Sequence, residues 1–413
     1  MKIGFAKTEI TPPMGTELGG YAGYRPCAGV HDPLWCKAVV LEQDGVRVAL
    51  LAMDLLSVDE SLSEAISKAL ESLEIRHVLV AAIHSHAAPC GIVLDQGPLA
   101  EVNRVSETDP AGFAAYMQTV IRQSEFACRA ALENMEPFAV STAQGPAPVL
   151  GSERHTGDKA NVTITAVRIL TESGRKLLLY QIPCHPTVMG PGNRLASADF
   201  VGGVEGNLDV DMAVFLNGAA GDISTRFTRR EQSFEECDRL AKIVAAALNQ
   251  LTADAPFRQP YPVRGIQTHI TLKPRPVDTP ENAAAALELA EKNWRKASEA
   301  GEPAGKLRIL KSYVEGAGVA LEFSYTMAGI RELQLPVTVF SFGGLKFATV
   351  PGEMFSSLWN VDAVPICYTN GYYRYIADEK AHDAGYYEAM AAILARGQGE
   401  VFMNQVARLL NII

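Results

Sequence analysis

The sequence predicts an α/β protein in which mixed β-sheets are flanked by helices. Apolar runs of strand length alternate with amphipathic runs of helix length through the first third of the chain. Asp44-Gly45 separates two apolar runs, 37–41 and 46–52, which is a strong signal for a β-hairpin. A helical pattern over 62–73 then leads into another apolar run, 78–83, which we expect to be a buried strand.

The later elements follow the same two periodicities. Asp109-Pro110 is a typical helix start, and that helix is expected to end near Asn134. A second amphipathic helix is expected over 231–251, and further apolar runs predict strands at 138–143, 161–169, 176–182, 211–217, 335–341 and 345–350. No internal repeat is evident, and we expect a single domain spanning 1–413.

Two segments depart from this alternation. From Asp278 an Ala- and Glu-rich helix with proline in its first turn, followed by a second helix, predicts a helical hairpin over 278–316. We expect this hairpin to be an inserted cap, with glycine joints at 301–303 and 316–318. The polar loop at 87–108 is longer than a plain connector, and we therefore expect it to have a function.

Composition excludes several classes of protein. Of 413 residues, 48% are hydrophobic and 20% charged, which is typical of a globular chain. The net charge of −10 argues against binding to nucleic acid or anionic membranes, and no apolar run approaches the ~18 residues of a transmembrane helix. The charged N-terminus lacks a signal-peptide pattern, and the seven cysteines contain no CxxC pair. These features predict a cytoplasmic protein with free thiols, and they leave a homo-oligomer open.

Two histidines close the apolar run at 78–83. If that run is a strand, the alternation of side chains places His84 and His86 on one face at its carboxyl end. Histidine is the commonest metal ligand, and open α/β sheets bind ligands just beyond the carboxyl ends of their strands. By itself the pair is also compatible with two surface histidines at a strand end.

Four further polar segments follow apolar runs: Pro183–Thr187, Asn217–Ser224, Pro351–Glu353 and Asn370–Tyr375. The first contains His185, and the third ends on a carboxylate, Glu353. The second is rich in small residues, which would let backbone amides approach a ligand. Each segment has an ordinary structural explanation, but their shared position at strand ends predicts a composite site.

These segments resemble, in order, the motifs of the neutral, non-lysosomal ceramidases and of shorter bacterial proteins that share only their N-terminal catalytic domain. The resemblance runs from Ile10-Thr11-Pro12-Pro13 and Gly20-Tyr21 to Tyr387. Three positions depart from the family pattern: Ala87-Ala88-Pro89 replaces Ser-Gly-Pro, and Thr225 replaces a proline. We expect no C-terminal immunoglobulin-like module and no secretory signal, and a membrane-lipid substrate is correspondingly less favoured.

The resemblance implies a zinc site and the residues around it. The family's zinc ligands fall on His84, His185, Glu353 (in Val-Pro-Gly-Glu) and Tyr375 (in Asn-x-Tyr-x-x-Tyr-Ile). The second histidine of the HxH, a hydrogen-bonding partner in the family's active site, falls on His86, and the Gly-Asp-x-Ser serine falls on Ser224. A tyrosine that binds the scissile carbonyl falls on Tyr387 in Tyr-Glu-Ala. A family arginine falls on Arg154 through a looser match, for which a solvated surface arginine is the alternative.

Two imidazoles, a carboxylate and a phenolate form a ligand set that suits Zn²⁺ and leaves room for water. We therefore expect a zinc-dependent hydrolase that cleaves an amide of an N-acylated small molecule or lipid with a zinc-activated water. Ser224 as a covalent nucleophile, with His86 as base, stays open. The alternatives are a metal-dependent esterase or deacetylase of a sugar-like metabolite and a non-catalytic metal- or metabolite-binding protein.

Overall fold

The computed structural model describes residues 1–93 and 109–413, so most of the loop expected to be functional (87–108) lies outside the described residues. Three four-stranded sheets form the body of the molecule. The N-terminal sheet has the order β1 (Lys2–Glu9), β3 (Trp35–Gln43), β4 (Val46–Met53), β6 (Ile75–Ala82). The middle sheet has the order β8 (Phe138–Pro146), β10 (Thr163–Thr171), β11 (Lys176–Ile182), β13 (Met212–Asn217). The C-terminal sheet has the order β15 (Arg264–Leu272), β16 (Leu333–Phe342), β17 (Leu345–Thr349), β19 (Val364–Ile366).

The three sheets share one topology, which the sequence does not reveal. In each, the first three strands are antiparallel neighbours and the fourth is parallel to the third. The two parallel strands of a sheet end at the same edge, so the loops that follow them lie together. Because β13 also contacts β4, β6 and β19, the loops from all three sheets gather in one place.

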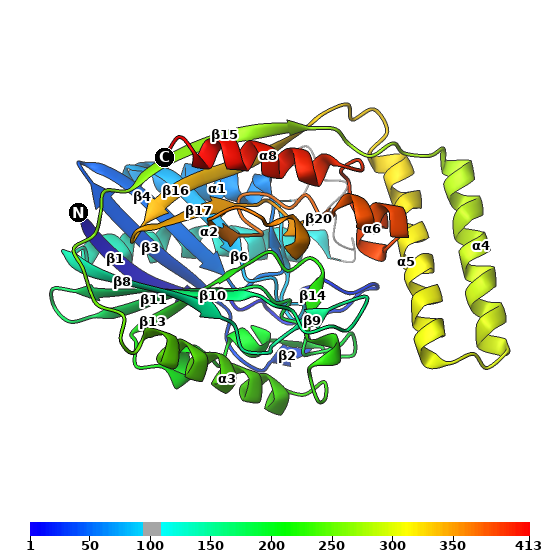
Figure 1. Cartoon of the computed structure of the whole chain (residues 1–413), viewed down its shortest axis with the longest axis horizontal. Helices are drawn as coiled ribbons and strands as arrows, with labels where there is room; N and C mark the ends of the chain where they lie inside the picture. The colour runs from blue at the N-terminus through cyan, green and yellow to red at the C-terminus, as the bar shows by residue number, and fades with distance from the viewer. Residues whose placement is uncertain (94–108) are drawn as a thin grey trace.

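The sheets face one another and are covered by helices on the outside (Figure 1). Strand β4 shows how the sequence produces this: Ala49 and Leu51 pack on the helical side, whereas Val48 and Leu50 face the core between the sheets. Helix α2 (Pro110–Glu133) packs on β1 and β3, α1 (Glu60–Leu70) on β6, α3 (Phe234–Thr252) on β8 and β10, and α8 (Gln398–Leu410) on β15, β16 and β17. The α/β class with mixed sheets and flanking helices is confirmed.

Short elements complete the chain around the strand ends. They are β2 (Gly29–Val30), β5 (Ser57–Val58), β7 (Cys90–Gly91), β9 (Ser152–Glu153), β12 (Leu195–Ala196), β14 (Ile223–Ser224), β18 (Glu353–Met354), β20 (Tyr375–Ile376), α6 (Glu379–Ala384), α7 (Tyr387–Met390) and the 3₁₀ turns η1 (Glu71–Leu73), η2 (Asp199–Val201), η3 (Glu205–Asn207), η4 (Thr225–Phe227) and η5 (Ser356–Leu358). In the described part of the chain no helix is both long enough and apolar enough to cross a bilayer.

The helical hairpin consists of α4 (Pro280–Glu299) and α5 (Ala304–Thr326) and stands out from the body on the side away from both termini (Figure 1). Its turn contains Gly301, as expected, but α5 continues to Thr326, so the expected end and glycine joint at 316–318 are wrong. Gly316 lies inside α5 and faces α7, where a Cβ would lie 2.6 Å from Met390 Cε and 3.0 Å from Met390 Cβ. This glycine therefore permits close helix packing and is not a hinge.

Candidate metal centre

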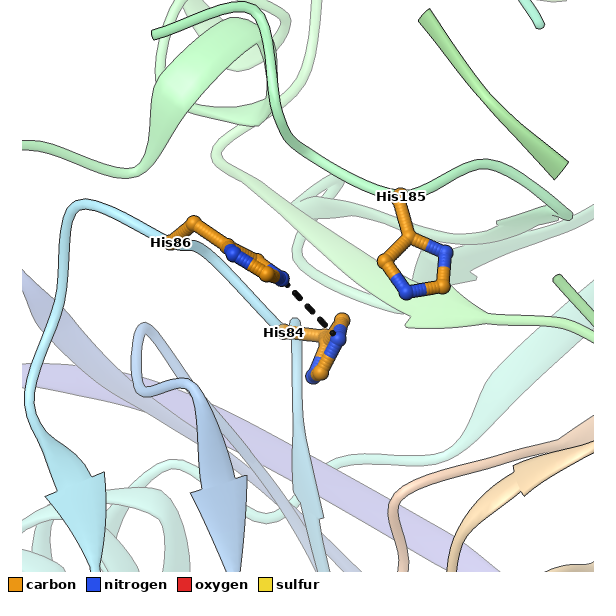
Figure 2. A group of neighbouring side chains, drawn as sticks. All are labelled: His84, His86 and His185. Carbon is orange, nitrogen blue, oxygen red and sulfur yellow. Dashed lines mark hydrogen bonds between the residues drawn. The ribbon is translucent and has the colours of Figure 1, made fainter. Parts of the chain in front are cut away.

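His84 and His86 lie in the turn after β6, not on the strand as expected. The strand ends at Ala82, and His84 has a left-handed backbone (φ 70°), which is uncommon for a residue with a Cβ. The alternation of strand side chains therefore does not apply to this pair. The two rings nevertheless meet, with 3.3 Å between their Nε2 atoms (Figure 2).

His185 reaches the same point from the middle sheet. It follows β11, is 0% exposed, and lies with its ring centroid 4.7 Å from that of His84 (Figure 2). Its backbone N–H donates to the Ile223 carbonyl at 3.2 Å, and a parallel bridge places it opposite Ser224. Two residues predicted from separate strand ends are thus adjacent through backbone pairing.

Glu353 and Tyr375 follow the parallel strands β17 and β19 of the C-terminal sheet and are also aligned by the backbone. Each lies in a two-residue strand, β18 and β20, and the parallel register places them directly side by side. Glu353 Oε2 lies 2.9 Å from His185 Nε2 and 3.4 Å from His84 Nε2. The predicted carboxylate ligand therefore contacts both predicted imidazole ligands.

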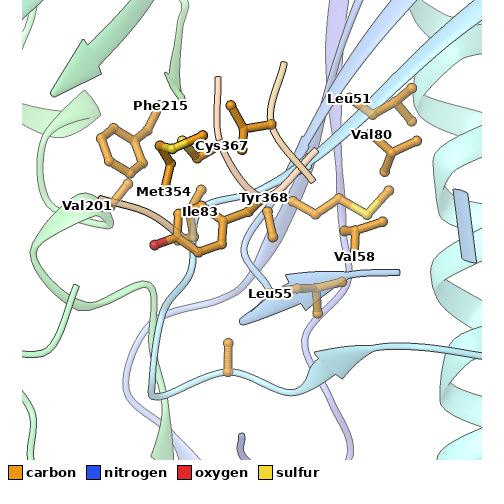
Figure 3. Packing of buried hydrophobic residues seen from close by; sticks show 14 of the residues in the cluster. Leu51, Leu55, Val58, Val80, Ile83, Val201, Phe215, Met354, Cys367 and Tyr368 are labelled. Carbon is orange, nitrogen blue, oxygen red and sulfur yellow. The ribbon is translucent and has the colours of Figure 1, made fainter. Parts of the chain in front are cut away.

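Buried apolar residues pack against these polar side chains. Ile83 precedes His84, Met354 follows Glu353, and Tyr368 begins the turn that leads to Tyr375. All three belong to one buried cluster (Figure 3). The His84 ring stacks on Tyr368 with 4.1 Å between centroids and 17° between planes. Close packing of this kind restricts the polar side chains that contact it to one rotamer.

Hydrogen bonds at Nδ1 distinguish the three histidines. His84 Nδ1 donates to the Leu56 carbonyl at 2.8 Å, and His185 Nδ1 donates to the Ala220 carbonyl at 2.7 Å. A carbonyl only accepts, so Nδ1 of both rings carries a proton, and Nε2 of both rings faces Glu353. His86 Nδ1 has no hydrogen-bond partner among the described residues and faces Gly20, where a Cβ would lie 2.4 Å away.

The charges of the site suit a divalent cation. Burial and Arg154 lower the pKa of His185 to about 3 despite the neighbouring Glu353, so this imidazole is neutral at pH 7. Burial and the other two histidines also hold the pKa of His86 well below its ordinary value. Burial alone would raise the pKa of Glu353, but His84 and His185 hold it well below its usual range, so the carboxylate is ionised.

Two imidazole nitrogens share one carboxylate oxygen. His185 Nε2 and His84 Nε2 lie 2.9 Å and 3.4 Å from Glu353 Oε2. Tetrahedral zinc with Zn–N bonds of about 2.0–2.1 Å separates its ligand atoms by roughly 3.3 Å. The residues present therefore fit a metal ion, and a buried group of His84, His86 and His185 is compact enough to hold one.

Tyr375 is held by Arg154, the residue predicted by the loosest match. Arg154 is 8% exposed, which excludes the alternative of a solvated surface arginine. Its Nη1 donates to Tyr375 Oη at 3.1 Å, to the Gly221 carbonyl at 3.2 Å and to Glu388 Oε1 at 3.3 Å. Burial alone would lower the pKa of Arg154, but Tyr375 and Glu388 raise it, so the guanidinium stays charged beside the phenol.

Ser224 and Tyr387 lie at the edge of this cluster. Ser224 Oγ accepts from the Arg226 N–H at 3.4 Å, and among the described residues it makes no hydrogen bond to an imidazole. Tyr387 begins α7, and its ring centroid lies 6.1 Å from that of Tyr375. Burial raises the pKa of Tyr387 to about 12, so its hydroxyl keeps its proton at neutral pH.

Two further polar residues of the site were missed from the sequence. Tyr372 Oη donates to Glu353 Oε1 at 2.6 Å, and Glu388 pairs with both Arg154 (3.3 Å) and His155 (3.0 Å). Each stands within three residues of a predicted one, in the same motif, which was the only signal available. Asp222 was quoted in the Gly-Asp-x-Ser motif without a role; it accepts from the Ser356 N–H at 2.7 Å and thereby ties the loop before Ser224 to the turn after Glu353.

Comparison with known proteins identifies the fold. No protein-family model matches the sequence, and no curated protein matches it significantly. Among solved structures, the neutral ceramidase of Pseudomonas aeruginosa superposes with a TM-score of 0.73 at 15% identity, covering 99% of this chain and 74% of that one. A structure described as ceramidase complexed with C2 superposes with a TM-score of 0.70 at 16% identity, again covering 99% of this chain and 74% of that one. The chain therefore has a ceramidase-like fold over nearly its whole length.

Proposed function

We propose that the protein is a zinc-dependent hydrolase that cleaves the amide bond of an N-acylated small molecule or lipid. The observation that supports this most is the buried convergence of the His185 and His84 imidazoles on one carboxylate oxygen of Glu353, at 2.9 and 3.4 Å. The ceramidase-like fold is consistent with amide hydrolysis, since the solved relatives are described as ceramidases.

His84, His185, Glu353 and Tyr375 would hold the ion. Metal-bound histidines almost always donate their second ring N–H to a carbonyl or carboxylate, and His84 and His185 do so whereas His86 does not. This difference supports His86 as a group beside the metal and not a ligand of it. When bound, Zn²⁺ would supply Lewis-acid chemistry that activates water and polarises the scissile carbonyl.

The remaining residues would act on the substrate. The neutral His86 imidazole presents Nε2 toward His84, where it can take a proton from the attacking water and return it to the leaving amine. The hydroxyls of Ser224 and Tyr387 would donate to the carbonyl oxygen as negative charge develops on it. Ser224 Oγ makes no hydrogen bond to a described imidazole, which favours attack by water over attack by serine.

A matched panel of substrates tests the reaction class. The zinc-loaded protein is incubated with an N-acyl amide, the ester of the same acyl group and an acetylated sugar, and each product is quantified. We expect turnover of the amide. Turnover of only the ester or the acetylated sugar would identify an esterase or deacetylase. Turnover of none of the three would favour a non-catalytic binding protein.

The α4–α5 hairpin is predicted to influence acyl selectivity. Helix α5 packs on α7, which begins with Tyr387, so the hairpin lies against the element that would contact the substrate. Removing residues 287–312 and joining the cut ends by a short glycine turn retains the contact at Gly316. We expect the truncated protein to accept bulkier acyl groups, with zinc content unchanged. Identical relative rates across an acyl series would show that the hairpin is scaffold.

A further inference from the structure

The turn between β19 and β20 places a tyrosine hydroxyl on the carboxylate of the proposed metal centre. Tyr372 Oη donates to Glu353 Oε1 at 2.6 Å, while Glu353 Oε2 faces the imidazoles of His84 and His185. The two carboxylate oxygens therefore have different partners. A distance of 2.6 Å is typical of a strong hydrogen bond from a hydroxyl to an ionised carboxylate.

The turn that presents Tyr372 is held at both ends. Asn370 binds β6 through its side chain, donating to the Val78 carbonyl at 3.0 Å and accepting from the Val80 N–H at 2.7 Å. On the other side, the Tyr373 N–H donates to the Pro351 carbonyl at 2.8 Å. Gly371 fits only without a side chain, because a Cβ there would lie 2.9 Å from Pro351 Cβ.

The backbone of this turn is specialised throughout. Tyr368, Asn370 and Arg374 all have positive φ angles, 57°, 56° and 54°, a conformation that residues with a Cβ rarely adopt. Three such residues within seven positions are retained when surrounding contacts enforce them, as occurs at functional sites. The position of the Tyr372 hydroxyl is therefore set by the fold before any ion binds.

We propose that Tyr372 is a positioning residue that makes Glu353 present one oxygen, Oε2, to a divalent cation. This inference rests on the metal centre proposed above. The hydrogen bond holds Oε1 toward the tyrosine while Oε2 faces the imidazoles, which favours binding of the ion through Oε2 alone. Single-oxygen binding leaves more of the coordination shell open to water and substrate, which catalytic zinc sites require.

Adjacent tyrosines allow a matched test. Tyr372→Phe removes the hydroxyl that donates to Glu353. The control, Tyr373→Phe, removes a hydroxyl that instead contacts Glu60 Oε2 at 2.9 Å and the Gln334 carbonyl at 2.6 Å. Zinc affinity is measured by competition with a chromogenic chelator, and the thermal midpoint of each variant is recorded. We expect Tyr372→Phe to bind Zn²⁺ 10–100-fold more weakly, the usual cost of removing an outer hydrogen bond to a ligand. Tyr373→Phe should lower the thermal midpoint and leave zinc affinity unchanged.

Crystal structures of the zinc-loaded proteins provide a second readout that does not depend on activity. In the wild type only Oε2 of Glu353 should lie within about 2.2 Å of the ion, and in Tyr372→Phe both oxygens should approach it. Two-oxygen binding in the wild type would overturn the inference even if the variant failed to fold, as would equal zinc affinity in the wild type and Tyr372→Phe. A zinc-loaded wild type that hydrolyses no amide would overturn the proposed function and leave this inference standing.

Discussion

Replacement of His185 by alanine is expected to abolish most zinc binding and, with it, most turnover. His185 is fully buried and makes the shorter of the two imidazole contacts to Glu353, 2.9 Å, so the substitution removes a ligand from the centre of the proposed site. The wild type should contain about one zinc per chain after dialysis, as a site with several protein ligands does. Metal content is measured by elemental analysis alongside the rate on an N-acyl amide.

Two further variants separate metal loss from misfolding. In the wild type the Ala220 carbonyl accepts from His185 Nδ1 at 2.7 Å. His185→Asn keeps an N–H that can reach this carbonyl, but it removes the Nε2 atom that faces Glu353. It should fold and still lose zinc. His269→Ala, on the exposed face of β15, should behave as the wild type. Unchanged zinc content in both His84→Ala and His185→Ala would show that the site is misassigned.

Replacement of His86 by alanine should separate chemistry from metal binding. Because His86 lacks the Nδ1 hydrogen bond that both proposed ligands have, we expect His86→Ala to keep its zinc. Loss of a positioned proton-transfer group should lower the rate on the order of 10²-fold or more. The control is His77→Ala, an exposed histidine on β6, which should retain full activity. If His86→Ala were folded but free of zinc, His86 would be a ligand and one of the other assignments would fall.

The strand ends could be predicted from the sequence because local rules determine them. The hairpin of β3 and β4 pairs Gln43 with Val46 across Asp44-Gly45, as the turn residues require. The apolar runs before His185 and Glu353 are β11 and β17, so the polar residues that follow were correctly placed at strand ends. The gathering of those ends could be suspected only from their shared position, since it depends on how three sheets pack.

The detailed geometry of the site could not be predicted, because it depends on very short and distant pairings. Glu353 and Tyr375 align through two-residue strands that carry no periodicity, and Ser152 and Ser224 pair in the same way. The left-handed backbone of His84 broke the alternation on which its placement relied. A glycine in a helix gave a wrong hinge at Gly316, since sequence alone does not distinguish close packing from flexibility.

The position of the metal tests the central claim most directly. Crystals of the zinc-loaded protein, measured above and below the zinc absorption edge, locate the ion by its anomalous scattering without reference to activity. We predict one strong peak bounded by His84 Nε2, His185 Nε2, a Glu353 oxygen and Tyr375 Oη. A peak bounded by the three histidines alone, or no peak between these residues, would contradict the proposed metal centre.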